Sequence, residues 1–251
     1  MKRISLFCLC WASCVLLFPA LSFAQSAAGY SNPESLDSIA QLNAIQQYHK
    51  LLSPENALYN GGEYIDYTTT LKTGYPYFGP DTVQEGWVVY DGTRYDHLLM
   101  WFDLVSQSLV LENPEHIYKM ELLKTRLQSF SISGHYFVQL KGDSINGIRS
   151  GFYERMYQGR VSLYKRSRKN IQETTGNRVV ERIVYADSAY YLERNGHFLP
   201  FGRKSQVNSV LGEKRKQVAA YMRKNQMSLG RALRRDKEGT LLKIVTYYDG
   251  L

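Results

Sequence analysis

Residues Val88–His97 read VVYDGTRYDH, and the Asp91-Gly92 pair inside this stretch indicates how the chain around it folds. An Asp-Gly pair between two apolar and aromatic runs is typical of a two-residue β-hairpin loop. We therefore expect antiparallel strands at Glu85–Tyr90 and Thr93–Asp103. Similar turn signals recur along the chain, at Ser133-Gly134, Asn146-Gly147, Gln158-Gly159 and Asn195-Gly196.

The segments between these turns predict an antiparallel β-meander over residues 63–200. They are short and rich in Tyr, Val, Thr and Leu, and the gaps between them are too short for the helices that parallel strands need. The fold class expected is α+β, mainly β, with the meander forming a curved sheet or a half-open barrel. The remaining strands are expected at Glu63–Leu71, Leu109–Leu111, Ile117–Glu121, Gln128–Ser133, His135–Leu140, Gly151–Tyr157, Val161–Ser167, Val179–Tyr185, Ala189–Glu193 and His197–Pro200.

Helices are expected before and after the meander. Apolar residues at helical spacing after Pro33 predict an amphipathic helix over residues 33–52. The tail, residues 205–248, predicts a helical cap with helices at Ser205–Leu211, Glu213–Lys224 and Asp236–Tyr248. Because no linker-like stretch interrupts this order, we expect residues 33–251 to form a single domain after a flexible lead at residues 25–32.

The first 24 residues have the layout of a cleaved secretory signal peptide. A basic start precedes the apolar run Ile4–Leu17, and Ser22-Phe23-Ala24 predicts cleavage after Ala24. A membrane anchor is the alternative, but the apolar run is short and early for one, and no later run approaches the ~20 apolar residues of a membrane-spanning helix. We therefore expect an exported protein, located in the periplasm or at the outer membrane. All three cysteines, Cys8, Cys10 and Cys14, lie in this segment, which leaves no cysteine for a disulfide or a thiolate nucleophile.

Charge is distributed unevenly along the chain. Residues 25–150 carry a net charge of −6, and residues 151–251 carry +12. Such a bipolar chain is suited to an anionic partner, such as a lipid head group, a cell-wall polymer or an acidic glycan; export argues against nucleic acid. The alternative is that the two halves attract each other. The basic residues expected to contact an anionic surface are Lys214, Arg215, Lys216, Arg223, Lys224, Arg234 and Arg235.

Motifs of catalysis and of metal or cofactor binding are missing. The five histidines have no zinc-ligand spacing, and neither Gly-x-Ser-x-Gly nor a phosphate-binding glycine motif occurs. No calcium loop starts at Asp91, because Thr93 and Tyr95 occupy its ligand positions. We therefore name no catalytic residue, no metal ligand and no cofactor.

Two weaker patterns leave room for a site on the sheet. Strand alternation would place Tyr95, His97 and Trp101 on one face, where they would line a ligand pocket or belong to the core. Carboxylates borne by the sheet could also form a glycosidase-type pair, although turn or surface roles are commoner for such residues. The acids concerned are Glu63, Glu85, Asp91, Asp96 and Asp103.

Several stretches carry a resemblance to a group of proteins. They are LYNGGEY at Leu58–Tyr64, VVYDGTRYDHLLMWFD at Val88–Asp103, GFYERMYQGRVSLY at Gly151–Tyr164 and the basic tail ending in YYDGL. With the signal peptide, the chain resembles uncharacterised exported proteins of Gram-negative bacteria, and this resemblance implies no activity. The expected architecture is also similar to the half-barrels of periplasmic lipoprotein carriers, a likeness of fold that supplies no function.

The pattern as a whole predicts a non-catalytic protein of the cell envelope. Its aromatic sheet would bind an apolar or glycan-like ligand or a protein, and its basic tail would face an anionic envelope component. A hydrolase of glycans or peptides that uses sheet carboxylates is the alternative. A purely structural component of a larger envelope assembly is a third hypothesis.

Overall fold

The computed structural model describes residues 41, 58–112, 118–142, 147–176 and 179–251. The chain divides into two compact units, residues 1–45 and 46–251, and everything described below belongs to the second. The expected signal peptide and flexible lead lie outside the described residues, as does the expected helix at 33–52 apart from residue 41. No helix in the described part of the chain is long and apolar enough to cross a membrane.

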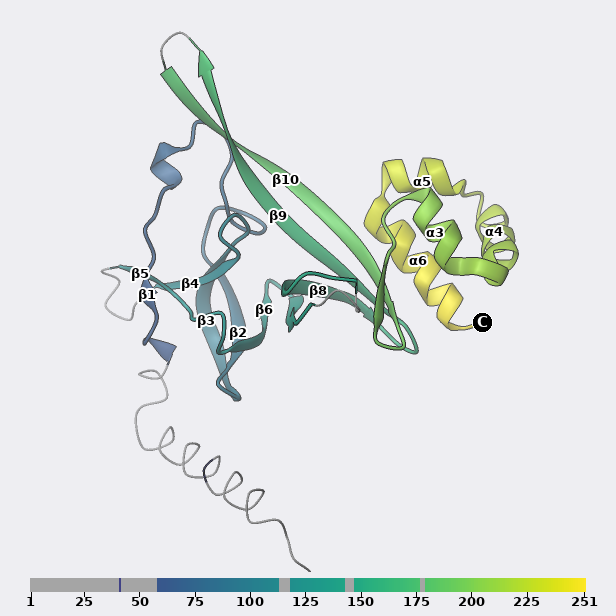
Figure 1. The fold of residues 1–251 in the computed structure, drawn as a ribbon, viewed down its shortest axis with the longest axis horizontal. Coiled ribbons are helices and arrows are strands. Elements are labelled where there is room, and N and C mark those ends of the chain that lie inside the picture. Colours follow the sequence, from purple (N-terminus) through teal and green to yellow (C-terminus); the bar gives the residue numbers. More distant parts are fainter. Residues whose placement is uncertain (1–40, 42–57, 113–117, 143–146, 177–178) are drawn as a thin grey trace, which may run out of the picture. The chain divides into compact units, whose positions relative to one another are not determined.

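The described strands form one open antiparallel sheet (Figure 1). Its order is β1-β5-β4-β3-β2-β6-β7-β8-β9-β10-β11, so β1 and β11 are its two edges and it does not close into a barrel. This confirms the predicted fold class. The strands are β1 Gly62–Glu63, β2 Gln84–Tyr90, β3 Thr93–Asp103, β4 Ser108–Glu112, β5 Lys119–Glu121, β6 Leu127–Ile132, β7 His135–Leu140, β8 Gly151–Gln158, β9 Ser162–Gly176, β10 Val179–Arg194 and β11 His197–Pro200.

The predicted hairpin at Asp91-Gly92 is confirmed. Tyr90 pairs with Thr93 across the turn. Asp91 and Gly92 have φ values of 50° and 77°, which is the backbone of a two-residue loop whose twist matches that of the strands. Ser133-Gly134 and Asn195-Gly196 repeat this geometry between β6 and β7 and between β10 and β11.

The prediction of a strand at Glu63–Leu71 is correct for Glu63 and wrong for the residues after it. Only Gly62–Glu63 pair with β5, and Thr68–Thr70 form a short 3₁₀ helix, η1. The reason is local: the Asp66 carboxylate accepts hydrogen bonds from the backbone N and the hydroxyl of Thr68, at 2.9 and 2.6 Å. Such a side-chain bond favours a turn over a strand.

Strands β9 and β10 are much longer than predicted. The sequence indicated strands at Val161–Ser167, Val179–Tyr185 and Ala189–Glu193, whereas the pairing runs from Ser162↔Glu193 to Gly176↔Val179 without a break. The mostly polar segment after Ser167 continues as a strand because the partner strand satisfies its backbone groups. Figure 1 shows this hairpin extending past the other strands.

The tail is helical, as predicted. It contains α3 Lys204–Leu211, the short 3₁₀ helix η2 Gly212–Lys214, α4 Arg215–Lys224, α5 Leu229–Arg235 and α6 Lys237–Asp249. Helix α5 falls in a segment for which the sequence indicated no helix. Ser228 and Asp236 flank it in extended conformations, which separates it from α4 and α6.

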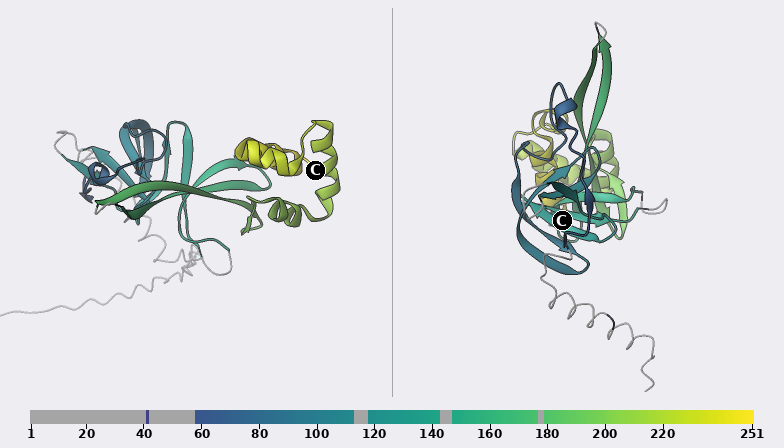
Figure 2. Two further views of the ribbon diagram at one scale, coloured as in Figure 1. Left: turned by 90° about the horizontal axis from the view of Figure 1, so that it is seen from above. Right: turned by 90° about the vertical axis from the view of Figure 1, so that its left-hand side faces the viewer.

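Two apolar clusters hold the sheet and the helices together. The first lies on the sheet and centres on Phe102, Phe130 and Phe137. In the second, Leu163 and Leu192 of the long hairpin pack with α6 residues such as Ile244. The helices therefore take their place from the base of the β9–β10 hairpin, which Figure 2 shows running from the sheet to the helices.

Candidate anion-binding site

A β-bulge in β3 separates the three residues that the sequence placed on one face. Gly86 pairs with Leu98 and Val88 pairs with Tyr95, so Trp87 alone stands opposite both Asp96 and His97. His97 has a φ of 57°, and the extra residue reverses the alternation of the strand after it. The prediction of a shared face is therefore wrong.

The structure places these three residues in three environments. Tyr95 is buried in the first sheet cluster, and Trp101 is buried in a separate cluster with Tyr64 and Tyr77. The His97 side chain is 88% exposed, and its Nδ1 lies 2.8 Å from Glu85 Oε1. Ligand binding by these residues stays a prediction, but they do not line one pocket.

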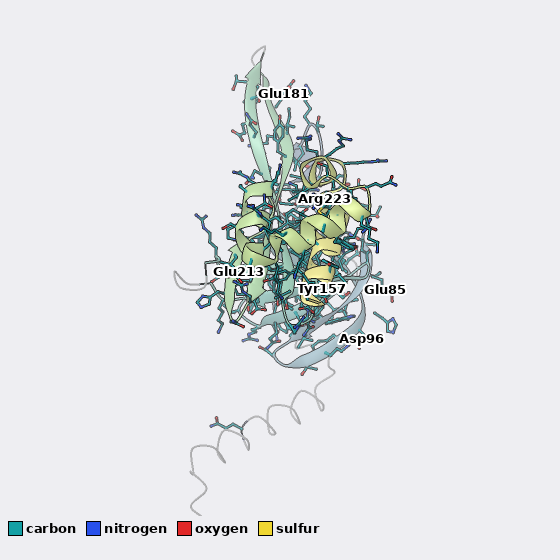
Figure 3. All side chains as sticks on the ribbon, turned by 90° about the vertical axis from the view of Figure 1, so that its right-hand side faces the viewer. Glu85, Asp96, Tyr157, Glu181, Glu213 and Arg223 are labelled. Atoms are coloured by element: carbon teal, nitrogen blue, oxygen red, sulfur yellow. The ribbon has the colours of Figure 1, made fainter. Side chains whose placement is uncertain are left out.

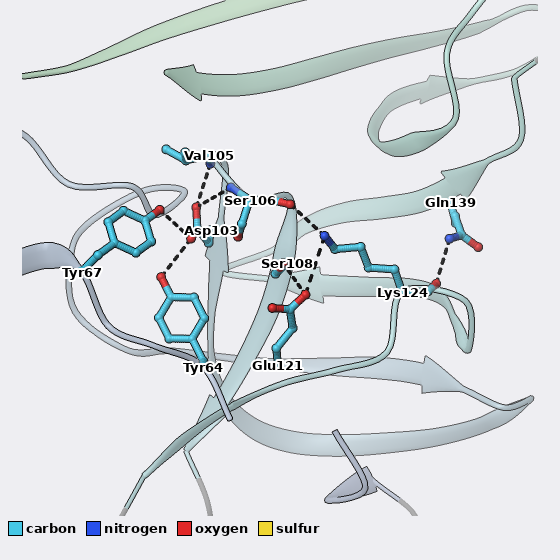
Figure 4. Close-up of polar contacts among 9 residues, drawn as sticks. All are labelled: Tyr64, Tyr67, Asp103, Val105, Ser106, Ser108, Glu121, Lys124 and Gln139. Carbon is cyan, nitrogen blue, oxygen red and sulfur yellow. Dashed lines mark hydrogen bonds and ion pairs between the residues drawn. The ribbon is translucent and has the colours of Figure 1, made fainter. Parts of the chain in front are cut away.

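Asp103 is fully buried, and its carboxylate accepts four hydrogen bonds (Figure 4). Tyr64 and Tyr67 donate to Oδ2 at 2.9 and 2.8 Å, and the backbone N–H groups of Val105 and Ser106 donate to Oδ1 at 2.7 and 3.1 Å. A carboxylate with this many donors is a structural anchor that fixes the β3–β4 turn to the chain before η1. It has no free lone pair directed at a substrate.

Burial, with Asp103 beside them, raises the pKa values of Tyr64 and Tyr67 well above their usual range. An unfolded tyrosine loses its proton near pH ~10. Above that pH the unfolded chain binds fewer protons than the folded chain, so we expect the free energy of unfolding to fall as pH rises. For Tyr64, which is 7% exposed, the slope is about 1.4 kcal/mol per pH unit.

Urea unfolding at pH 9 to 11.5 measures this slope. We expect Tyr64→Phe to make it shallower, because the variant removes one titrating group. Tyr185→Phe is the matched control, because Tyr185 is exposed. Equal slopes in both variants would contradict the prediction.

The other acids that the sequence singled out on the sheet are mostly paired. Asp96 contacts Arg94 at 2.7 Å, Asp91 contacts Arg126 at 3.4 Å, and Glu85 contacts His97. These ion pairs lie at the surface: Arg94–Asp96 lies within β3, and the other two pairs join neighbouring strands or turns. Among the described residues, no group of three or more His, Asp or Glu side chains is placed to hold a metal ion.

The helical region carries the largest excess of charge. Residues 203–251 hold twelve Lys and Arg and only four Asp and Glu. Three of these four acids already have structural partners. Asp236 caps α6 through the Gly239 N–H, Glu238 contacts Lys165 at 2.6 Å, and Asp249 accepts from the Val161 N–H and the Tyr157 hydroxyl.

None of these twelve basic residues lies within ion-pair distance of a carboxylate in the described part of the chain. Lys214 and Lys237 instead lie over the rings of Tyr248 and Tyr190. Within residues 58–150, the acids with ion pairs to Lys, Arg or His of that same segment are Asp66, Glu85, Asp91, Asp96 and Glu121, so these five do not pair with the basic half. The positive charge of the helices is left for the solvent or for a partner. Figure 3 views the molecule from the side of the helices and labels one of these residues, Arg223.

Four of these basic residues border an apolar groove of about 530 Å³, formed by α3, α4 and the start of α5. The basic residues are Lys204, Arg215, Lys216 and Arg223. The apolar part of the lining consists of Leu211, Val218, Ala219, Met222, Met227 and Leu229. No carboxylate of the described residues lines the groove. Clefts of ~300–1,000 Å³ with an apolar lining and a few polar groups are typical of small-ligand sites.

The structure brings together part of the basic set that the sequence singled out. Arg215, Lys216 and Arg223 border the groove, while Lys214, Lys224, Arg234 and Arg235 lie on the same helical region outside it. Sequence reasoning missed Lys204 and the apolar residues Met227 and Leu229. The signal for the last two was the Ser228 position before a run of Leu, Ala and Arg, which is compatible with a helix start.

Comparisons of this chain with known protein families, with curated proteins and with solved structures gave no match. The fold and the candidate site define this protein by its architecture, which is an open antiparallel sheet that carries a basic helical region with a groove.

Proposed function

We propose that this is a non-catalytic protein of the cell envelope whose C-terminal helices bind an anionic component. Lipid head groups and anionic cell-wall polymers are the partners that suit it. The observation that carries the proposal is that twelve basic residues on residues 203–251 have no carboxylate partner among the described residues. Unpaired surface cations attract anionic partners and are worth about 1 kcal/mol each near an anionic membrane surface.

The location in this proposal rests on sequence alone. The basic start, apolar run and Ser22-Phe23-Ala24 of the first 24 residues support export, with the mature chain beginning after Ala24. An exported chain meets lipid head groups and cell-wall polymers rather than nucleic acid. The periplasm and the outer membrane both offer such partners.

The hydrolase alternative gains little support from the geometry. A glycosidase needs two carboxyl groups about 5–10 Å apart in an open cleft. Asp103 is buried under four donors, and Asp91, Asp96 and Glu85 are occupied by ion pairs. We therefore do not propose a hydrolytic reaction.

Binding to vesicles tests the proposed function. We expect the mature chain to bind vesicles containing anionic phospholipid at low salt and to lose that binding as salt rises, because exposed charges are screened beyond the Debye length. The variant R234Q/R235Q removes two exposed cations of α5. It should weaken binding by about fivefold per cation, hence about 25-fold.

The matched control is K141Q/R149Q, which removes two exposed cations beside the β7–β8 connection. It lowers the net charge equally but leaves the helices unchanged. If both double variants weaken binding by the same factor, net charge alone explains it and the helices have no special role. If no binding occurs at low salt, the proposed surface is wrong.

A further inference from the structure

The groove on the helical region combines an apolar lining with basic side chains at its border. Its lining is mainly apolar, and α4 contributes Val218, Ala219 and Met222 to it. Val218 and Met222 are buried members of the core between hairpin and helices, so the groove opens directly onto that core. Ala219 is exposed, and its small side chain leaves the groove accessible from solvent.

Positive charge borders this apolar lining, and no carboxylate among the residues that the structure describes lies beside it. Lys204 comes from the start of α3, Arg215 and Lys216 from the first turn of α4, and Arg223 from its last turn. Cations therefore approach the groove from more than one helix. An occupant needs an apolar part for the lining and an anionic group for these cations.

The size of the groove suits a small ligand. Its volume of about 530 Å³ falls within the ~300–1,000 Å³ of small-molecule sites. Met222 and Met227 suit a flexible chain, because methionine side chains adapt their shape to what they contact.

We propose that the groove binds a single-chain anionic amphiphile, in which one alkyl or acyl chain lies on the apolar lining and a phosphate or carboxylate head group contacts the cations. This inference rests on the proposed function in one respect, since both use the cations of the helices. It goes further because the apolar chain, and not charge alone, provides much of the affinity.

Chain length tests the contribution of the lining. Calorimetric titration of the mature chain with octyl and decyl phosphate, each below its micelle-forming concentration, should show decyl phosphate binding about fifteenfold tighter, since each buried methylene is worth about fourfold. Decyl maltoside has the same chain without the charge and should bind more weakly than decyl phosphate. Butyl phosphate, titrated in the same way, is the short-chain reference. Equal affinities for butyl, octyl and decyl phosphate would overturn the proposal and leave only a charge effect.

Two alanines of α4 provide a matched pair of variants. Ala219 lines the groove, and Ala220, which is also exposed, is not one of its lining residues. We expect Ala219→Trp to fill the groove and weaken decyl phosphate binding at least tenfold, and Ala220→Trp to leave it within about twofold. Circular dichroism spectra of both variants check that the helices are intact. Equal effects of the two substitutions would overturn the assignment of the site.

The vesicle experiment separates this inference from the proposed function. Suppose that A219W still binds anionic vesicles in a salt-dependent way and that octyl and decyl phosphate bind the unchanged protein equally well. The surface proposal then stands and the groove site fails. If decyl phosphate binds as expected and vesicles do not bind, the groove site stands and surface binding fails.

Discussion

Replacing Asp103 with alanine is expected to lower the free energy of unfolding by about 3–5 kcal/mol. The carboxylate is fully buried and accepts hydrogen bonds from two tyrosine hydroxyls and two backbone N–H groups. Alanine would leave these four donors without an acceptor in a site that is closed to water. Unsatisfied buried donors cost about 1–3 kcal/mol each, and partial relaxation of the turn reduces the sum.

Urea unfolding followed by tyrosine and tryptophan fluorescence measures this loss. Asp187→Ala is the matched control, because Asp187 lies exposed on β10 without a polar partner among the described residues, and it should change stability by less than 0.5 kcal/mol. Asp103→Asn keeps one carbonyl oxygen and should fall between the two. A loss below about 1 kcal/mol for Asp103→Ala would mean that the four hydrogen bonds contribute little.

Local sequence signals predicted the meander because they act over a few residues. Asp91-Gly92 and Asn195-Gly196 needed no distant information, since the loop conformation follows from the residues themselves. The same holds for α6, which begins after the capping residue Asp236. Features that depend on distant residues could not be predicted from local signals. Strand β9, for example, extends to Gly176 only because β10 pairs with it.

The shared face of Tyr95, His97 and Trp101 was predicted wrongly because one inserted residue moves every later side chain of the strand to the opposite face of the sheet. Alternation along β3 is correct on each side of the bulge, but His97 at positive φ shifts Trp101 to the opposite face from Tyr95. Histidine at such a position has no distinctive sequence pattern. The bulge is visible only in the pairing of β3 with β2.

The basic site was predicted as a set of charges, not as a shape. Lys216 and Arg223 were identified from charge clusters, yet the groove also needs Leu229 of α5 and Lys204 of α3. These parts are far apart in sequence and meet because α3, α4 and α5 pack together against the hairpin. The sequence also could not show that the cations of the helices have no carboxylate partner within the described segments, because such pairing depends on how the segments pack.

A chain of charged side chains connects the sheet to the helices. His135 Nδ1 lies 2.6 Å from Glu154 Oε1, and Lys165 Nζ lies 3.6 Å from Glu154 Oε2 and 2.6 Å from Glu238 Oε1. The Tyr190 hydroxyl donates to the same Glu238 oxygen at 3.0 Å. Glu154 is buried and Lys165 is largely buried, with side chains 8% and 12% exposed. Lys165 and Tyr190 therefore both link the first turn of α6 to the sheet, and Lys165 is the link that carries a charge.

We expect Lys165→Met to lower the free energy of unfolding by about 3 kcal/mol, because it leaves the buried Glu154 charge with His135 as its remaining partner. Urea unfolding measures the loss, and hydrogen exchange should show faster exchange at the start of α6, where Glu238 loses its cation. Lys243→Met is the matched control, since Lys243 is exposed on α6 and has no ion-pair partner among the described residues.

The double variant E154M/K165M distinguishes a buried ion pair from simple packing. Replacing both members of such a pair with apolar residues of similar volume is often close to neutral, whereas removing one member leaves an uncompensated charge. We therefore expect the double variant to regain most of the stability that Lys165→Met loses, while exchange at the start of α6 stays fast because Glu238 still lacks its cation. If the double variant is less stable than Lys165→Met, Lys165 acts through its packing and not through the charge of Glu154.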